Sequence, residues 1–284
     1  MKIVITGAGG LVGAEFVKRF SKNHQVLALN HEALDITERR AVRRLICGER
    51  PELVINCAVV GVDASQHNPA LAQAVNCVGA ENLARMSAEI EAEFLHLSTN
   101  YVFDGERQSN SFYTINDAPS PVNVYGETKL AGERAVLSAA SRSFIIRTSW
   151  VFGHGKENFF STAHRRLRAA ESLRATTNIR ASATYVADLA ARVEEILARH
   201  CYATYHVVNS GGCSSYEFAL EAARILKMTK TEIDELIEPV EEEEMRRGAK
   251  RPRSTPMRCL VSEELGFAPM RDWRLALRDY IQST

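Results

Sequence analysis

Three residues of this chain have side chains suited to proton transfer at a carbonyl group: Thr99, Tyr125 and Lys129. Tyr125 and Lys129 are four positions apart in "VYGETK", so on a helix they share one face. An ammonium group beside a phenol favours the phenolate and lowers a tyrosine pKa from its usual value of about 10. Together with the Thr99 hydroxyl, this pair predicts a site where a phenol protonates a carbonyl oxygen.

A Tyr–Lys pair alone is more often a feature of a helix surface, so a second signal is needed. The stretch "GAGGLVG" supplies it, with Gly7, Gly10 and Gly13 between an apolar segment and a helical pattern. Gly7 permits a tight turn, Gly10 lets a pyrophosphate approach the backbone, and Gly13 lets the helix pack closely on the strand. The N-terminus of the helix attracts the anion. We therefore predict a dinucleotide-binding turn.

The second apolar segment ends in "ALNHEALDIT", where NAD-binding proteins usually have an acidic residue that binds the ribose 2′-hydroxyl. Asn30 stands at this position and would not repel a 2′-phosphate. We therefore favour NADPH, with NADH as the alternative cofactor. Asp35 is a candidate to accept a hydrogen bond from the adenine amino group, with Ile36 against the ring.

Strands and helices alternate in the first half of the chain, as the pattern of apolar residues indicates. Strands are expected at 2–7, 25–30, 52–58, 93–99 and 143–149, and helices at 11–22, 38–48, 70–90 and 126–140. This order is typical of an α/β fold with a doubly wound parallel Rossmann sheet. Ligands of such sheets bind beyond the carboxyl ends of the strands, which would place Thr99 beside the cofactor.

The second half predicts a smaller C-terminal α/β lobe. Helical patterns cover 158–170, 182–200 and 214–227, and a strand is expected at 204–210. We predict a dinucleotide-binding domain over residues 1–150 and a mainly substrate-binding lobe over residues 151–284, with an interleaved boundary. The charged run 241–253 is interpreted as a solvated helix end and loop. The alternative is that Arg251 or Arg253 reaches an anionic ligand.

Composition excludes several classes of protein. The formal net charge is zero and the sequence pI is about 7.1, so no nucleic-acid partner is expected. No apolar run reaches the roughly 20 residues that cross a bilayer, and the N-terminus lacks a signal-peptide pattern, so we expect a cytoplasmic protein without a membrane partner. The six cysteines form no C-x-x-C pair, which argues against a disulfide framework or a structural zinc site.

Over essentially its whole length, the sequence resembles the dTDP-4-dehydrorhamnose reductase family of extended short-chain dehydrogenases/reductases. The motifs in question are "GAGGLVG", "LDIT", "ERPELVINCA", "STNYVFDG", "SPVNVYGETKLAGE", "RTSWVFG", "NFFST", "ATYVADLA", "YHVVNSG", "SSYEFA" and "KRPRST". The resemblance implies NAD(P)H-dependent reduction of the 4-keto group of a nucleotide-linked deoxyhexulose. It leaves two alternatives: a non-catalytic cofactor-binding subunit similar to the methionine adenosyltransferase beta subunit, or another nucleotide-sugar epimerase or reductase.

The resemblance also implies roles for individual residues. Thr99, Tyr125 and Lys129 fall on the catalytic positions of the family. Its cofactor positions correspond to Gly7, Gly10, Leu11, Val12, Asp35, Ile36, Ala58 and Lys129, to which the glycine spacing adds Gly13 and the end of the second apolar segment adds Asn30. Its sugar-binding positions correspond to Val62, Asn100, Tyr101 and Trp150, to which we add Arg253. Trp150 is alternatively a core aromatic residue.

Two departures from the family pattern concern the substrate. The family commonly reads S-T-D-Y-V-F where this chain has "STNYVF", so Asn100 replaces an acidic residue. An amide donates as well as accepts hydrogen bonds, which can change the preferred sugar; alternatively, the amide is a tolerated near-isostere. In "CAVVGVDASQ", Gln66 also replaces an acidic residue.

Some members of the family pair through a magnesium ion. Glu15 is suggestively placed for such an ion, but we assign no metal. A homodimer remains open.

Overall fold

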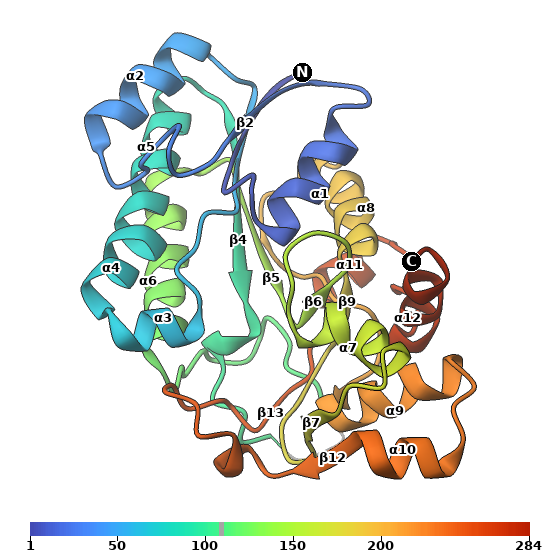
Figure 1. The fold of residues 1–284 in the computed structure, drawn as a ribbon. Coiled ribbons are helices and arrows are strands. Elements are labelled where there is room, and N and C mark those ends of the chain that lie inside the picture. The colour runs from blue at the N-terminus through green and yellow to red at the C-terminus, as the bar shows by residue number, and fades with distance from the viewer. Residues whose placement is uncertain (108–110) are drawn as a thin grey trace.

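A six-stranded parallel sheet forms the centre of the protein, shown in Figure 1 as a computed structural model that describes residues 1–107 and 111–284. The strands are β1 (Lys2–Thr6), β2 (Gln25–Leu29), β3 (Leu53–Asn56), β4 (Glu93–Thr99), β5 (Ser143–Thr148) and β10 (Thr204–His206). Their order is β10–β5–β4–β3–β1–β2, and all neighbours are parallel. The predicted doubly wound sheet is confirmed. Because β1 lies between β2 and β3, the winding direction reverses there, and ligands of open α/β sheets bind at this point.

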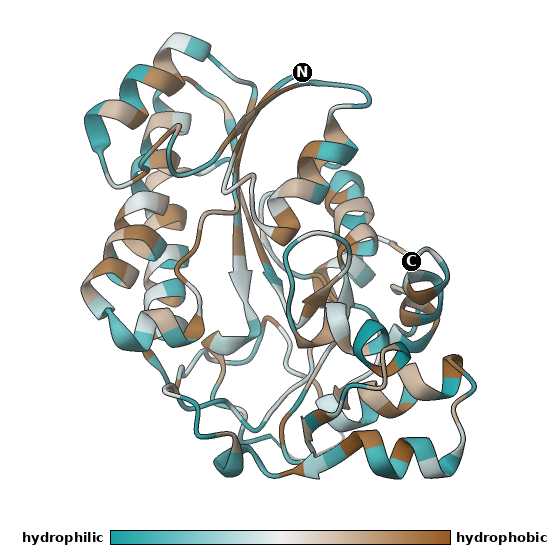
Figure 2. Ribbon diagram, viewed as in Figure 1, coloured by the Kyte–Doolittle hydropathy of each residue, from teal (hydrophilic) through white to brown (hydrophobic). Residues whose placement is uncertain are grey.

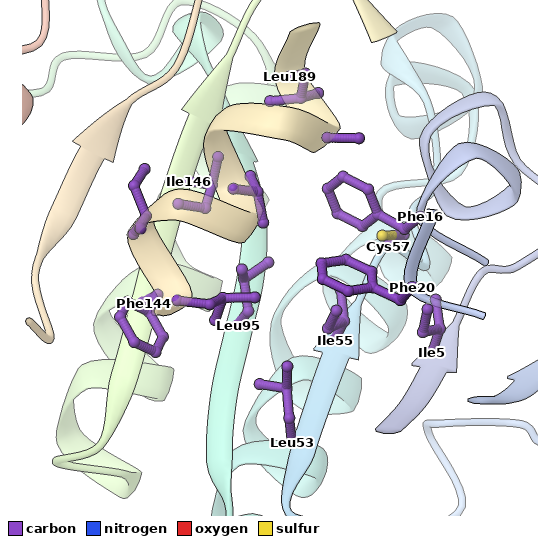
Figure 3. Packing of buried hydrophobic residues seen from close by; sticks show 14 of the residues in the cluster. Ile5, Phe16, Phe20, Leu53, Ile55, Cys57, Leu95, Phe144, Ile146 and Leu189 are labelled. Atoms are coloured by element: carbon purple, nitrogen blue, oxygen red, sulfur yellow. The ribbon is translucent and has the colours of Figure 1, made fainter. Parts of the chain in front are cut away.

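Helices cover both faces of the sheet (Figure 1). On one face lie α1 (Leu11–Phe20) and α8 (Val186–Leu197), and on the other α2 (Arg39–Glu49), α5 (Ala80–Glu89) and α6 (Val124–Ala139). Figure 2 shows the hydrophobic residues that run along the central strands between these layers. In Figure 3, Phe16 and Phe20 of α1 pack over Ile5 and Ile55, and all four side chains are buried. Burial of each such side chain contributes about 1.5–3 kcal/mol to folding.

The helix expected at 70–90 is confirmed, but it contains a π-helical turn. After α3 (Val62–His67), α4 (Pro69–Gln73) leads through the turn η1 (Ala74–Gly79) directly into α5. The turn presses on α6, where a Cβ atom at Gly132 would lie 2.2 Å from the Asn76 carbonyl oxygen. The Asn76 side chain accepts from the Val60 amide at 2.9 Å and donates to Thr128 Oγ1 at 3.1 Å. The π-helical turn therefore fixes the loop that follows β3.

A second, smaller lobe follows at the lower right of Figure 1. Its helices are α7 (Phe159–Arg168), α9 (Ser215–Ile225), α10 (Lys230–Leu236) and α12 (Trp273–Gln282), whereas α11 (Leu260–Glu264) packs against the core of the central sheet. Its short strands are β6 (Val151–Phe152), β7 (Leu173–Thr176), β8 (Arg180–Ala181), β9 (Thr184–Tyr185), β11 (Cys213–Ser214), β12 (Ile237–Val240) and β13 (Ser254–Thr255). Trp273 and Phe218 anchor a separate apolar core. The predicted serine start of α9 is confirmed, because Ser214 and Glu217 form a capping box.

Several boundaries differ from the expected ones. The segment 182–200 begins with β9 before α8 starts, and the strand expected at 204–210 ends at His206. The charged run contains only a short 3₁₀ turn, η3 (Glu242–Met245). Both α8 and β10 lie beyond residue 150 yet belong to the central sheet layers, so the domain boundary near 150 stays a prediction. In the described ranges, no helix is long and apolar enough to cross a bilayer.

Candidate active site

The turn between β1 and α1 is built for close contact with a ligand backbone or phosphate. Gly7 has φ +67°, and a Cβ atom there would lie 2.5 Å from the Ala58 amide nitrogen. A Cβ atom at Gly13 would lie 2.2 Å from the Gly7 carbonyl oxygen, so helix and turn touch directly. Among the described residues, no side chain caps α1, and its first turn carries no acidic residue. The N–H groups of Leu11 and Val12 are therefore suited to an anion, which fits a pyrophosphate.

A cavity of about 280 Å³ adjoins this turn and brings together most of the predicted cofactor residues. It is lined by Thr6, Gly7, Asn30, His31, Leu34, Asp35, Ile36, Ala58, Val59, Val60, Leu71 and Val75. Asp35 Oδ1 accepts from both the amide and the hydroxyl of Thr37, at 2.9 and 2.8 Å. These bonds hold the Asp35 pKa below its ordinary value, so the residue is an ionised acceptor.

Asn30 directly follows the end of β2 and lines this cavity. Its Oδ1 atom accepts from the Ala33 amide at 2.9 Å, which leaves its Nδ2 donor for a ligand. A donor at this position suits a 2′-phosphate better than a carboxylate would. The turn and this cavity therefore fit a phosphorylated dinucleotide.

A second cavity of about 310 Å³ lies at the carboxyl ends of β4 and β5 and collects the predicted catalytic residues. It is lined by Val12, Cys57, Val59, Val62, Leu97, Ser98, Thr99, Asn100, Tyr101, Tyr125, Lys129, Thr148, Ser149, Trp150 and Val151. Thr99 ends β4, and Tyr125 and Lys129 come from α6, which starts at an Asn123 cap. Residues predicted separately as catalytic and sugar-binding thus share one wall with Val12 of the glycine turn.

The position of Trp150 is compatible with both interpretations that the sequence left open, a sugar-binding residue and a core aromatic residue. It lines this cavity, and it also stacks on Phe160 of α7 with ring centroids 4.6 Å apart. Its φ of +39° is in the left-handed region, which costs about 1–3 kcal/mol for a residue with a side chain. The surrounding packing holds the indole at the junction of the sheet and the small lobe.

The predicted lowering of the Tyr125 pKa is wrong for the protein without cofactor. Burial raises the pKa of Tyr125 to about 12, although the Thr99 hydroxyl acts in the opposite direction. The Lys129 amine instead contacts β4, where it donates to the Leu97 carbonyl at 2.6 Å and lies 3.1 Å from His96 Nε2. Burial also lowers the pKa of Lys129 to about 8. Desolvation of both groups therefore outweighs the attraction that helical spacing alone implies.

A buried ion pair supports the floor of this cavity, and sequence reasoning missed it. Glu133 accepts from Arg147 Nε and Nη2 at 2.9 and 2.7 Å, and Ser98 donates to the same carboxylate. Glu133 and Arg147 are only 2% and 6% exposed. The pair ties α6 to β5, and Ser98 ties both to β4 next to Thr99. An arginine inside the apolar strand "SFIIRTS", and a glutamate four residues after Lys129, were the available signals.

Asn100 is buried against the small lobe. Its Nδ2 atom donates to Thr255 Oγ1 of β13 at 2.6 Å, and its Oδ1 atom lies 3.3 Å from the Thr99 hydroxyl, which donates to it. One of the two amide hydrogens is thus used to join the sheet to the lobe. The asparagine has a structural partner that the sequence did not reveal, in addition to its place in the cavity wall.

The two arginines of the charged run have different surroundings. The Arg251 guanidinium is buried and forms two 2.6 Å bonds with the Asp63 carboxylate of α3. Arg253 is largely exposed, 3.9 Å from Glu243, and lines a third cavity of about 320 Å³. That cavity is lined by Glu106, Ile179, Glu242, Glu243, Arg246, Arg247, Ala249, Lys250, Arg251 and Arg253. Arg253 therefore does not line the cavity that holds Thr99, Tyr125 and Lys129. Burial raises the pKa of Tyr101 in that cavity, and the charges of Arg251 and Arg247 oppose this shift.

Comparison with known proteins agrees with this geometry. The family model described as RmlD substrate binding domain matches residues 1–284. A dTDP-4-dehydrorhamnose reductase of Mycolicibacterium smegmatis is 37% identical, with 99% of this chain and 85% of the relative covered. The spore coat polysaccharide biosynthesis protein SpsK of Bacillus subtilis is 35% identical, with 99% and 97% covered.

A solved structure extends the comparison to the whole fold. The dTDP-4-dehydrorhamnose reductase of Bacillus anthracis strain Ames, crystallised in complex with NADP, superimposes with a TM-score of 0.93 at 32% identity. The superposition covers 100% of this chain and 99% of the other. The sheet, the glycine turn and the cavity with Thr99, Tyr125 and Lys129 thus occur in a chain that belongs to the RmlD substrate-binding-domain family.

Proposed function

We propose that this protein is an NADPH-dependent oxidoreductase that reduces the 4-keto group of a nucleotide-linked 6-deoxyhexulose. The observation that carries the proposal is the cavity wall shared by Thr99, Tyr125 and Lys129, next to Val12 of the glycine turn. The named relatives support it, because the reductases of Mycolicibacterium smegmatis and Bacillus anthracis carry this activity in their names. NADPH, when bound, supplies the hydride for the carbonyl carbon.

The protein's own residues manage the proton and the carbonyl oxygen. With its pKa raised to about 12, Tyr125 keeps its proton at neutral pH until negative charge develops on the carbonyl oxygen. The Thr99 hydroxyl, which donates to Asn100 Oδ1 at 3.3 Å, would turn its one hydrogen to that oxygen as a second hydrogen bond. Lys129 lies one helical turn from Tyr125, and a positive charge there favours the phenolate that remains after proton transfer. Asn100, Tyr101, Val62 and Trp150 are proposed to orient the sugar ring.

The third cavity is proposed to hold the diphosphate of the nucleotide sugar. Four basic side chains, those of Arg246, Arg247, Lys250 and Arg253, line it beside the buried Arg251. Burial raises the pKa of Tyr101, and Arg251 and Arg247, which line this cavity, act in the opposite direction, so their charges reach the sugar-binding candidate Tyr101. Guanidinium groups suit phosphates because they donate two parallel hydrogen bonds. In this arrangement Arg253 binds the diphosphate from the third cavity, and not from the cavity that is lined by Thr99, Tyr125 and Lys129.

The direct test is the loss of the near-ultraviolet absorbance of NADPH in the presence of dTDP-4-dehydrorhamnose. Turnover by the wild type, abolished in Tyr125→Phe, would support the proposal with this sugar. Turnover only in Asn100→Asp would mean that the enzyme is a reductase for another sugar. Bound NADPH without turnover of any keto-sugar nucleotide would contradict the proposal and favour a non-catalytic cofactor-binding subunit.

We expect Asn30→Asp to shift cofactor preference from NADPH toward NADH. A carboxylate at this position would repel the 2′-phosphate and accept from the 2′-hydroxyl. A repulsion of about 1.4 kcal/mol changes the ratio of kcat/KM values by a factor of ~10. Steady-state kinetics with both cofactors measures this ratio. Asn23→Asp is the matched control, since Asn23 is exposed in the turn after α1, away from the cavity lining; an equal shift in the control would refute the role of Asn30.

We propose a homodimer in the cytoplasm, and light scattering of the purified protein tests the first point. The division into a dinucleotide-binding domain over 1–150 and a mainly substrate-binding lobe over 151–284 is likewise proposed, with α8 and β10 returning to the first part.

A further inference from the structure

A buried chain of hydrogen bonds joins the glycine turn to Lys129, and its direction is fixed by the amide of Asn56. The Asn56 Oδ1 atom lies 3.1 Å from the Ala58 backbone nitrogen, which can only donate, and it also accepts from Thr6 Oγ1 at 2.8 Å. Oδ1 must therefore face Ala58 and Thr6. The Nδ2 group, a donor without acceptor capacity, then faces His96.

This orientation determines which nitrogen of His96 carries the proton. Asn56 Nδ2 lies 3.2 Å from His96 Nδ1, so Nδ1 has to be the acceptor. A neutral imidazole with an acceptor at Nδ1 carries its hydrogen on Nε2. The ring is fully buried, and burial lowers the His96 pKa well below its ordinary value, so the imidazole is neutral. His96 therefore presents an N–H group from Nε2.

The partner of that N–H group is the amine of Lys129, 3.1 Å away. An ammonium ion has three donors and no acceptor, so it cannot accept this hydrogen. A neutral amine can, because its lone pair accepts from Nε2–H while one of its own hydrogens points to the Leu97 carbonyl, at 2.6 Å. The hydrogen bonds of His96 Nε2 and of the Lys129 amine are therefore both satisfied only when Lys129 is uncharged. Burial lowers the pKa of Lys129 to about 8, so the neutral form predominates above about pH 8 and the charged form below it.

We propose that His96 is a positioning residue that holds Lys129 as a neutral amine in the cofactor-free protein at alkaline pH, and that this neutral Lys129 takes up one proton from solvent when NADPH binds. This coupling rests on the NADPH binding of the proposed function. The protonated side chain must leave His96, because two N–H donors would otherwise face each other. It then turns toward acceptors such as ribose hydroxyl oxygens, near phosphates whose negative charge stabilises an ammonium ion.

The other groups that face Lys129 do not replace it as the proton acceptor. From α6, Glu133 favours the charged amine but is held by Arg147, and Tyr125 keeps its proton because its pKa is raised to about 12. From the loop after β3, the Cys57 thiol is also protonated, since burial raises its pKa to about 12. At pH ~9, about nine-tenths of Lys129 is neutral when its pKa is about 8.

Calorimetric titration of the wild-type protein with NADPH tests the coupling. Titrations at about pH 9 in two buffers that differ in ionisation enthalpy give the number of protons taken up per NADPH bound. The 2′-phosphate of NADPH, with a second pKa near 6, is fully ionised there and does not contribute. We expect uptake of about 0.9 proton per site at pH ~9 and about 0.1 from Lys129 at pH ~7.

Two substitutions test the role of His96. Asn56→Asp replaces the Nδ2 donor by an acceptor oxygen of the same shape, so His96 shifts its hydrogen to Nδ1 and Nε2 accepts from an ammonium ion. His96→Gln offers Lys129 a carbonyl oxygen without adding charge. Both variants should hold Lys129 as an ammonium ion before NADPH arrives, and the uptake at pH ~9 should fall below about 0.3 proton.

The possible results separate this inference from the proposed function. Saturable NADPH binding to the wild type without proton uptake at pH ~9 would overturn the coupling while leaving the proposed function intact. Uptake that persists in folded Asn56→Asp and His96→Gln proteins would overturn the role of His96. Absence of NADPH binding to the wild type would contradict the proposed function, and with it the coupling. The wild-type measurement decides the first point even where a variant folds poorly.

Discussion

Replacing Tyr125 with phenylalanine is expected to lower kcat for keto-sugar reduction by about 10²–10⁴-fold, the usual contribution of a positioned proton donor. The ring and its edge-to-face contact with Tyr101, at 5.6 Å between centroids, would remain. The variant loses only the hydroxyl that protonates the carbonyl oxygen. NADPH affinity should change little, because the glycine turn and the cavity around Asp35 are untouched. Steady-state kinetics and a separate titration with NADPH measure the two quantities.

The matched control for this substitution is Tyr101→Phe. Tyr101 lines the same cavity, and its ring packs against that of Tyr125, but it is proposed to contact the sugar rather than to donate the proton. The control removes the same atom from a ring whose centroid lies 5.6 Å from that of Tyr125, and it should raise KM more than it lowers kcat. Equal losses of kcat in the two variants would show that Tyr125 is not the specific proton donor.

Glu133→Ala is expected to have the largest effect on stability. It leaves the Arg147 guanidinium buried without its carboxylate and removes the acceptor for Ser98. Removal of one partner from a buried ion pair costs about 3–5 kcal/mol. Urea unfolding, followed by circular dichroism, measures the free energy of unfolding. Activity should also fall, since Ser98 precedes Thr99 on β4.

Arg134→Ala is the control for this prediction. Arg134 follows Glu133 on α6 but is exposed, so its loss should change the free energy of unfolding by no more than about 0.5 kcal/mol. A double substitution of Glu133 and Arg147 by apolar residues should recover part of the loss, because no unpaired charge remains buried. A cost of less than about 1 kcal/mol for Glu133→Ala alone would mean that water reaches Arg147 and solvates it.

Local sequence patterns were sufficient for the scaffold and for three catalytic candidates. The continuous apolar strands predicted a parallel sheet because such strands are buried on both faces. The spacing of Gly7, Gly10 and Gly13 predicted the turn, since the reasons for each glycine lie within a few residues or in the next strand. Tyr125 and Lys129 were paired by helical geometry alone. Some boundaries shifted, as at β9, where a short strand occupies the start of the expected helical segment and α8 begins only at Val186. The helices α10 and α12 were not expected.

Tertiary structure decided the partners and the protonation of these side chains. The partners that matter are far apart in sequence: His96 and Lys129 by 33 positions, Asn100 and Thr255 by 155, and Asp63 and Arg251 by 188. No spacing rule connects such residues, because the crossovers of the sheet bring them together. The pKa values of Tyr125 and Lys129 depend on burial, which a sequence shows only as a tendency. The sequence by itself thus determined which groups are present and on which elements, whereas desolvation and long-range contacts in the folded chain determined their protonation and their partners.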